Sequence, residues 1–300
     1  MLSEEKQTQF AALRRQIIAA EFGRMNPRQL EGVLTTEGPL LLLAGAGSGK
    51  TTVLINRIAN LLRYGRGADS SEVPDYIEDA DFNFLADYAS KSDHTEQENA
   101  RAHLLCALEP AAPWQVIAIT FTNKAAGELK QRLEDRIGPD AQDVWAATFH
   151  SACVRILRRD IEKLGFPSSF TIYDTDDSLR VIKESLKALN MDDKSFPPRS
   201  VLGYISRAKD DMQLAEDFLD QAKAQGDFRL QKIGNVYLAY QKKLWAAGAL
   251  DFDDIILHTV RLLQKFPEVR EYYQRKFHYV LIDEYQDTNH LQYLLAALLA

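Results

Sequence analysis

The stretch Pro39-Leu40-Leu41-Leu42-Leu43-Ala44-Gly45-Ala46-Gly47-Ser48-Gly49-Lys50-Thr51 decides the fold. Its apolar half, Leu40 to Ala44, is typical of a buried strand, and a helix-compatible segment, Thr52 to Leu62, follows the glycine-rich half. Small residues let successive backbone N–H groups turn toward phosphate oxygens, and the N-terminus of the next helix adds partial positive charge. The pattern is a Walker A motif with Ala44 in place of the usual first glycine, and it predicts a nucleotide-binding site.

The motif assigns roles to individual side chains. Lys50 is expected to reach the β- and γ-phosphates, and the Thr51 hydroxyl is expected to ligate Mg²⁺. The predicted ligands are therefore a nucleoside triphosphate and Mg²⁺. The candidate nucleotide contacts in the loop and at the helix start are Ala44, Gly45, Ala46, Gly47, Ser48, Gly49, Lys50, Thr51 and Thr52.

A second apolar run ends in two acids more than two hundred residues later. Tyr279 to Ile282 reads as a strand and delivers Asp283 and Glu284. A carboxylate at the end of a strand can hold Mg²⁺, which we assign to Asp283. We assign to Glu284 the removal of a proton from the attacking water. Lys50, Asp283 and Glu284 together predict nucleotide hydrolysis.

Composition restricts the class of protein. Three hundred residues with 46% hydrophobic content suffice for one large or two moderate domains. No run approaches the 18 apolar residues of a membrane span, and Met1 to Arg15 is charged and polar, so we expect a soluble, cytoplasmic protein without a membrane partner. Cys106 and Cys153 are too few for a disulfide framework or a cysteine-rich zinc site, and only magnesium is expected as a metal.

The acidic charge is concentrated in one stretch. Residues 65–113 contain eleven acids and three bases, a balance of −8, so the total of −7 leaves +1 for the rest of the chain. Two parts of this stretch, Ala80 to Tyr88 and Thr95 to Leu108, have helical apolar spacing. We expect an acidic, helical surface elaboration whose deletion leaves turnover unchanged. The alternative is a protein-docking arm or a negatively charged flap that disfavours DNA on its face.

Strand-like and helix-like runs alternate along most of the chain. The expected strands are Leu40 to Ala44, Gln115 to Thr120, Val144 to Phe149 and Tyr279 to Ile282. Such runs, apolar on both faces and followed by helices, predict an α/β fold of the P-loop NTPase (RecA-like) class, with a parallel sheet covered by helices. Between Arg158 and Gly234 the pattern becomes mostly helical, apart from a strand-like run at Ser169 to Tyr173, which predicts an inserted helical subdomain.

Six short motifs occur in the order found in one family. The segment from Ala118 to Ala126 resembles motif Ia of superfamily 1A DNA helicases of the UvrD, PcrA and Rep type. The other matches, from Asn26 to Thr288, are Asn26 to Gln29 (Q motif), the Walker A loop, Thr148 to Ser151 (motif Ib), Leu250 to Asp254 (motif Id) and Asp283 to Thr288 (motif II). Thr52 stands where the family often carries Arg.

The resemblance adds functional residues to those derived above. It implies ATP as the nucleotide, with Gln29 reading adenine and Gln286 linking the γ-phosphate site to the DNA surface. Phe121 is expected to stack on bases, since aromatic faces tolerate any sequence. The remaining candidate nucleic-acid contacts are polar groups at strand ends, suited to phosphate and sugar: Thr122, Asn123, Lys124, Thr148 and His150.

The resemblance also implies a domain plan. Residues 1–158 and 234–300 correspond to domain 1A, which carries the acidic insertion 65–113, and residues 159–233 correspond to domain 1B. The family's later motifs do not follow Thr288, so we expect the second, C-terminal motor domain to be missing. Without its arginines the piece is expected to bind ATP weakly, to hydrolyse it very slowly and to unwind nothing.

The expected parent is a DNA-stimulated ATPase that translocates 3′ to 5′ on single-stranded DNA, with junctions of single- and double-stranded DNA and a repair or replication protein as further partners. Two alternatives stay open. One is a subunit of a helicase-nuclease, and the other is an ATP-gated DNA-binding or interaction module without turnover. The sequence leaves the pathway and the preferred DNA structure undecided.

Overall fold

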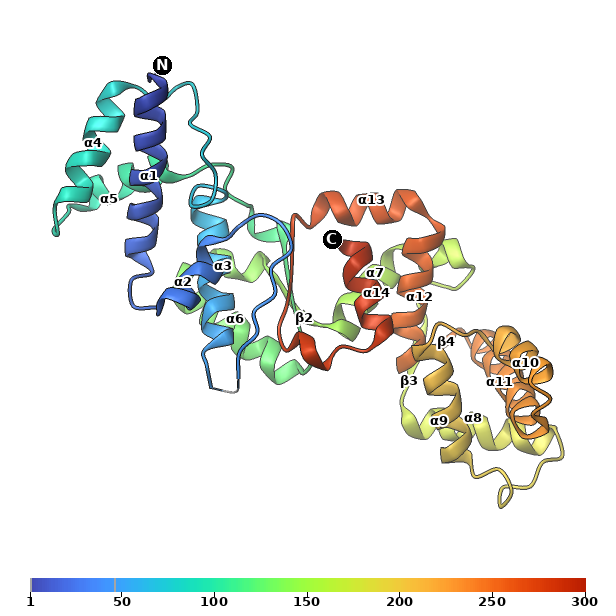
Figure 1. Ribbon diagram of the computed structural model, residues 1–300. Helices are drawn as coiled ribbons and strands as arrows, with labels where there is room; N and C mark the ends of the chain where they lie inside the picture. The colour runs from blue at the N-terminus through green and yellow to red at the C-terminus, as the bar shows by residue number, and fades with distance from the viewer. Residues whose placement is uncertain (1, 46) are drawn as a thin grey trace. The chain divides into compact units, whose positions relative to one another are not determined.

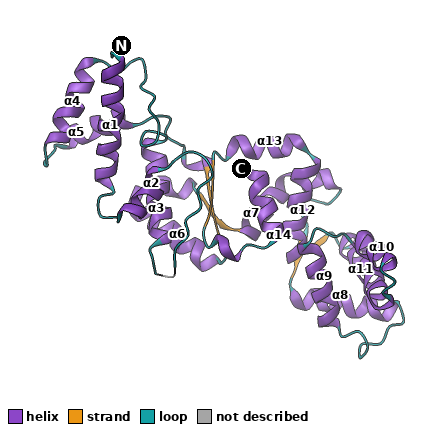
Figure 2. Cartoon of the chain, in the orientation of Figure 1, coloured by secondary structure: helices purple, strands orange, loops and turns teal. Residues whose placement is uncertain are grey.

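The computed structural model describes residues 2–45 and 47–300 (Figure 1). The chain divides into two compact units. The first comprises residues up to Ala118, Thr122–Ala146 and Leu281–Asp283, and the second comprises Ile119–Phe121, Ala147–Val280 and Glu284–Ala300. Helices dominate both units (Figure 2). The predicted domain plan, with boundaries at 158/159 and 233/234, stays a prediction, although helix α11 (Phe228–Ala246) runs through the second of these positions.

The described elements follow one another as α-helices, short 3-10 helices and strands. The α-helices are α1 (Glu4–Glu21), α2 (Pro27–Leu34), α3 (Lys50–Tyr64), α4 (Asp79–Ser90), α5 (Glu96–Cys106), α6 (Asn123–Ile137), α7 (Phe149–Asp160), α8 (Thr175–Ala188), α9 (Pro198–Asp210), α10 (Ala215–Ala224), α11, α12 (Phe252–Lys265), α13 (Pro267–Lys276) and α14 (His290–Leu299). The strands are β1 (Val116–Thr120), β2 (Trp145–Thr148), β3 (Thr171–Tyr173), β4 (Ala249–Asp251) and β5 (Tyr279–Ile282). The 3-10 helices are η1 (Pro113–Gln115), η2 (Pro139–Asp143), η3 (Ile161–Leu164) and η4 (Tyr285–Asp287).

The α/β class is confirmed. Strands β1, β2 and β5 form a three-stranded sheet in the order β2-β1-β5, so β1 is the central strand. All five residues of β1 are buried, as expected for a strand covered on both faces. Strands β3 and β4 form a separate parallel pair in which Ile172 lies opposite Leu250. Strand β4 was not among the expected strands, because three residues are too few to show a period of two.

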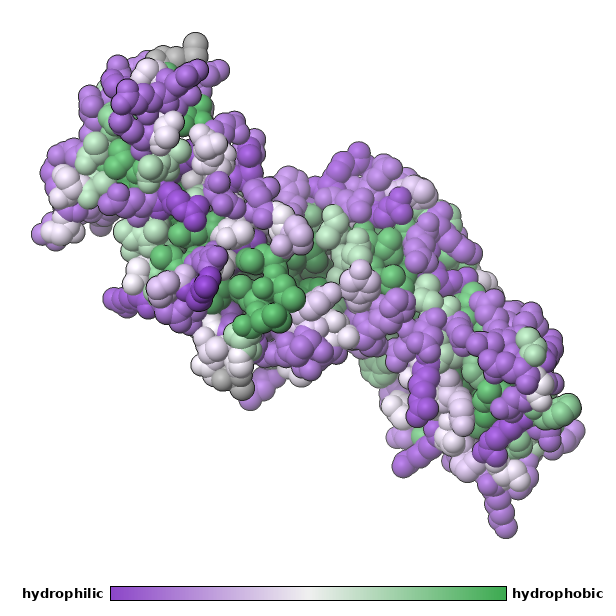
Figure 3. Space-filling view, in the orientation of Figure 1, coloured by the Kyte–Doolittle hydropathy of each residue, from purple (hydrophilic) through white to green (hydrophobic). Residues whose placement is uncertain are grey.

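The predicted strand Leu40 to Ala44 is wrong for this structure. These residues have no strand assignment, and the side chains of Leu41 and Leu43 are 60% and 86% exposed. An apolar run indicates that a segment can enter a sheet, but a strand also needs a neighbour whose backbone pairs with it, which local sequence does not specify. Apolar patches of this kind interrupt an otherwise hydrophilic surface (Figure 3).

The acidic stretch 65–113 contains the two expected helices, α4 and α5, but it is not a detached elaboration. It leaves the body of the first unit at Gly65 and returns at Leu108, and these two residues form a parallel bridge. Gly65 has φ +55°, and a Cβ there would lie 2.2 Å from the carbonyl oxygens of Leu108 and Glu109, so no other residue fits. Helices α4 and α5 pack against α1.

This packing gives the first unit a core that depends on the acidic stretch. Leu85 of α4 and Cys106 of α5 are fully buried in one cluster with Phe10 and Ile18 of α1. Several acids of the stretch also pair with bases, as Asp81 does with Arg101 and Asp79 with Lys6. The stretch is therefore a structural part of the unit.

The mostly helical character of residues 159–233 is confirmed. Helices α8, α9, α10 and α11 share a core in which Ile182, Val236 and Tyr240 are fully buried. Among the described residues, no helix is both long and apolar enough to cross a membrane.

Candidate nucleotide and nucleic-acid site

The glycine-rich loop of the first unit has the backbone that a phosphate cradle requires. Gly47 and Gly49 adopt left-handed conformations, with φ of +74° and +86°. Gly49 is the N-cap of α3 and contributes no side-chain cap, so the start of this 15-residue helix depends on its backbone alone. A helix N-terminus of this kind favours an anion. Ala46, one of the predicted contacts, lies outside the described residues.

Lys50 lies over the loop that precedes it. Its Nζ donates to the carbonyl oxygens of Ala44, at 3.1 Å, and Gly45, at 3.3 Å. The ammonium is thus held at the loop, where a phosphate would approach. Thr51 and Thr52 follow in the first turn of α3, and the Thr52 hydroxyl accepts a hydrogen bond of 3.1 Å from Arg132 of α6.

Gln29 links the start of α2 to the same loop. Its Nε2 donates to the Ser48 carbonyl at 2.8 Å, and its Oε1 accepts from the Asn26 backbone at 3.1 Å. The Asn26 Oδ1 in turn accepts from the Gln29 backbone N–H at 2.9 Å, which completes a capping box. Both ends of the Gln29 amide therefore have one protein partner each, and each end keeps capacity for one more hydrogen bond, which a base edge could use.

The acidic pair follows β5 as predicted. Asp283 comes directly after the strand, and Glu284 adopts a left-handed conformation with φ +52° and ψ +44°. Such a conformation costs a residue with a Cβ roughly 1–2 kcal/mol. Strain of this kind concentrates at functional sites, where it aims a side chain. In the second unit, Gln286 of η4 donates a hydrogen bond to the Glu284 carboxylate.

Phe121 follows β1 and is partly exposed. Its ring packs edge-on against the buried ring of Phe149, with centroids 5.5 Å apart. Phe149 supports the ring from one side, which leaves an aromatic surface for stacking.

Two threonines among the predicted nucleic-acid contacts are helix caps. The Thr122 hydroxyl accepts from the Ala125 backbone at 3.1 Å and begins α6, and the Thr148 hydroxyl accepts from the Ser151 backbone at 3.2 Å and begins α7. Each cap marks a helix N-terminus, where a phosphate oxygen is favoured. Asn123 and Lys124 occupy the exposed first turn of α6, where Lys124 lies 3.8 Å from Glu128.

His150 has a neighbour that sequence reasoning missed. The ring of Phe252, the first residue of α12, lies edge-on to the imidazole with centroids 5.8 Å apart and is 49% exposed. His150 also hydrogen-bonds to the Phe252 backbone. Burial lowers the pKa of His150, against the attraction of Asp253, so the ring is neutral at pH 7. The motif Id resemblance covers Phe252, but only the structure shows an exposed ring beside His150.

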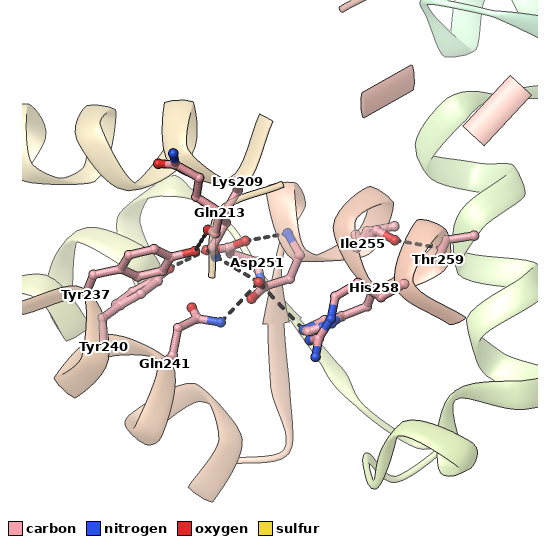
Figure 4. A network of polar contacts seen from close by, with 11 residues as sticks. Lys209, Gln213, Tyr237, Tyr240, Gln241, Asp251, Ile255, His258 and Thr259 are labelled. Atoms are coloured by element: carbon pink, nitrogen blue, oxygen red, sulfur yellow. Dashed lines mark hydrogen bonds and ion pairs between the residues drawn. The ribbon is translucent and has the colours of Figure 1, made fainter. Parts of the chain in front are cut away.

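A buried ionic network holds the start of α12 (Figure 4). Lys209 of α9 is fully buried, and its Nζ lies 2.6 Å from Asp251 Oδ2 and 2.8 Å from Asp254 Oδ1. The Tyr240 hydroxyl donates to the same Asp251 oxygen at 2.7 Å. Burial opposes the charge on Lys209, but the attraction of the two carboxylates outweighs it and raises the pKa of Lys209 well above its usual value. Burial lowers the pKa of His258 to about 3, so this ring adds no charge.

Comparison with known proteins decides the family. The sequence model described as the UvrD/REP helicase N-terminal domain matches residues 25–73 and 99–300. The chain belongs to the UvrD/REP helicase family. Residues 74–98, which contain α4, lie outside the match, so this part of the acidic stretch is not accounted for by the family pattern.

Named relatives belong to the same family. The chain is 47% identical over 276 residues to the ATP-dependent DNA helicase PcrA of Bacillus subtilis, which covers 92% of this chain and 31% of the relative. Proteins of the same name from Staphylococcus epidermidis and Staphylococcus aureus are 44% and 43% identical over 92% and 94% of the chain. The chain spans about a third of the length of these relatives. The predicted family is therefore confirmed.

Proposed function

We propose that the chain is the nucleotide-binding N-terminal part of an ATP-dependent DNA helicase that moves 3′ to 5′ along single-stranded DNA. The observation that carries the proposal is the joint presence, in a member of the UvrD/REP family, of a phosphate loop with left-handed glycines and a strand that ends in Asp283 and a left-handed Glu284. The relatives' name, ATP-dependent DNA helicase, supports ATP and DNA as ligands. The same proposal includes a cytoplasmic location and the plan of domains 1A and 1B.

Each side chain in the nucleotide site has one role in this proposal. The Ala44 to Thr52 segment, through its backbone and the Lys50 ammonium, binds the phosphates, and Gln29 orients the base. Thr51 and Asp283 would hold Mg²⁺, which when bound would supply positive charge to polarise the phosphoanhydride bond of ATP. Glu284 accepts a proton from the attacking water, and Gln286 positions its carboxylate.

The nucleic-acid face uses aromatic rings and helix starts. Phe121 and, from the structure, Phe252 offer faces for base stacking. Thr122, Asn123, Lys124, Thr148 and His150 offer donors to phosphate and sugar. None of these groups reads a base edge specifically, which suits a motor that must pass any sequence, including junctions of single- and double-stranded DNA.

The exposed leucines support a longer protein around this chain. Leu41 and Leu43 are 60% and 86% exposed, whereas Leu40 and Leu42 are 39% and 37% exposed. A soluble protein rarely leaves such a run of leucines exposed unless another surface covers it. A second motor domain in the full-length protein would supply such a surface, together with the cations needed for rapid turnover.

Replacing Phe121 with Ala tests the nucleic-acid face. In the full-length protein we expect Phe121→Ala to weaken binding of a single-stranded oligonucleotide by about 1–3 kcal/mol, or roughly 5- to 150-fold in Kd, because one stacking platform is lost. Fluorescence anisotropy measures this affinity. Phe228→Ala, which removes a ring that is 79% exposed at the start of α11, is the matched control and should leave the Kd unchanged. Equal affinities for both variants would contradict the assigned role of Phe121.

A further inference from the structure

The last turn of α9 contacts all three acids at the start of α12. Lys209 pairs with Asp251 and Asp254, and Ser206, three residues earlier on the same face of α9, hydrogen-bonds to Asp253. Asp251 and Asp254 also exchange side-chain-to-backbone bonds, a capping box that begins α12. The position of the first turn of α12 is therefore fixed by α9.

That first turn carries the groups next to His150. Phe252 lies between Asp251 and Asp253, its ring packs on the imidazole, and its backbone hydrogen-bonds to the same ring. Asp253 also interacts electrostatically with His150. A shift of α9 would thus move Phe252 and His150, two residues of the proposed nucleic-acid face.

The next residue of α9 reaches a different part of the second unit. Asp210 accepts a hydrogen bond of 2.9 Å from the side chain of Asn289, which is the N-cap of α14. Asn289 is joined to Glu284 by η4, a single turn in which Asp287 and Thr288 bond back to Glu284 and Tyr285. α9 also packs on α12, and α12 packs on α14, so a displacement of one of these helices would be felt by the others.

We propose that the end of α9, Ser206 to Asp210, is a coupling junction that transmits the occupancy of the nucleic-acid face at Phe252 and His150 to the segment that carries Glu284. This role rests on the proposed function, since it concerns stimulation of ATP turnover by DNA. Ser206, Lys209 and Asp210 are positioning residues that touch neither ligand. The junction lies in the inserted helical segment, which gives that segment a part in turnover.

Asp210 and Asn289 offer the cleanest test, because both side chains are only partly buried and neither belongs to the buried ionic network. In the full-length protein we expect Asp210→Ala and Asn289→Ser each to reduce the factor by which single-stranded DNA stimulates ATP turnover by at least about fivefold, the lower end of typical coupling between sites. Serine keeps the N-cap of α14 and loses only the donor to Asp210. The Kd for ATP, the Kd for oligo-dT, basal turnover and Tm should be unchanged.

The double variant and a neighbour complete the experiment. Asp210→Ala with Asn289→Ser should lower stimulation no further than either single change, because both remove the same contact. Asp211→Ala, an exposed acid one residue along, should leave stimulation intact. The coupling role of the junction would be refuted if both single variants kept normal stimulation of ATP turnover by DNA. It would also be refuted if Asp211→Ala lost as much stimulation as they do. Neither result would refute the proposed function. An unmodified protein whose turnover ignores DNA would refute the proposed function and the junction with it.

Discussion

Glu284→Gln in the full-length protein is expected to reduce ATP turnover by about 10²- to 10⁴-fold, the usual contribution of a general base. Glutamine has nearly the shape of glutamate but cannot accept the proton of the attacking water. The left-handed backbone at position 284 and the hydrogen bond from Gln286 are compatible with either side chain, so the site should keep its geometry. ATP affinity is therefore expected to remain within a few fold of the unmodified protein.

Two assays separate these effects. Steady-state phosphate release measures turnover, and binding of a fluorescent ATP analogue measures affinity. Glu268→Gln, at an exposed glutamate of α13 that pairs with Lys163, makes the same chemical change on the surface and should alter neither quantity. A Glu284→Gln protein that turns over ATP at the normal rate would favour the ATP-gated module, in which hydrolysis has no role.

Leu85→Ala is expected to destabilise the 300-residue chain by about 2–5 kcal/mol. The side chain is fully buried in the cluster that joins α4 to α1, so its removal forfeits apolar burial and leaves a cavity. Urea unfolding followed by circular dichroism measures the change in the first transition. Leu104→Ala in the neighbouring α5 removes the same side chain from a position that is 75% exposed. Its free energy of unfolding should stay within about 0.5 kcal/mol of that of the unmodified chain.

The result bears on how the acidic stretch can be tested. Deletion of residues 65–113 would expose Phe10 and Ile18. A loss of activity after this deletion could therefore result from unfolding of the first unit as well as from loss of a binding partner. Equal stability of Leu85→Ala and Leu104→Ala would contradict this structural role and would favour the solvated surface elaboration that the sequence predicted. Because deletion would disturb the core, a surface exchange such as Tyr76→Ala is the better probe of protein docking, since Tyr76 is 68% exposed.

Local sequence patterns predicted those strands and helices that depend on residues next to one another in the sequence. Strand β5 was predicted to the residue, and β1 and β2 to within one or two, because apolar runs and the polar residues that end them are local features. The helices of the acidic stretch followed from apolar spacing in the same way. Leu40 to Ala44 failed because strand pairing depends on a neighbour that no local run specifies.

For the candidate site, the sequence predicted which residues take part but not how their side chains contact one another. The phosphate loop and Asp283-Glu284 carry motifs with fixed spacing, so each position could be named. Nothing in the sequence indicated that both ends of the Gln29 amide bond to protein groups or that Phe252 packs on His150. The Lys209 network joins residues more than forty positions apart, and only the folded chain brings them together.

ATP turnover tests most directly our proposal that this chain is part of a DNA-stimulated ATP motor. Phosphate release should be measured for the full-length protein with and without single-stranded DNA, beside residues 1–300 under the same conditions. We predict strong stimulation by DNA in the full-length protein and very slow, unstimulated turnover by residues 1–300. Absence of stimulation in both proteins would contradict the account and would remove the DNA roles assigned to Phe121 and His150.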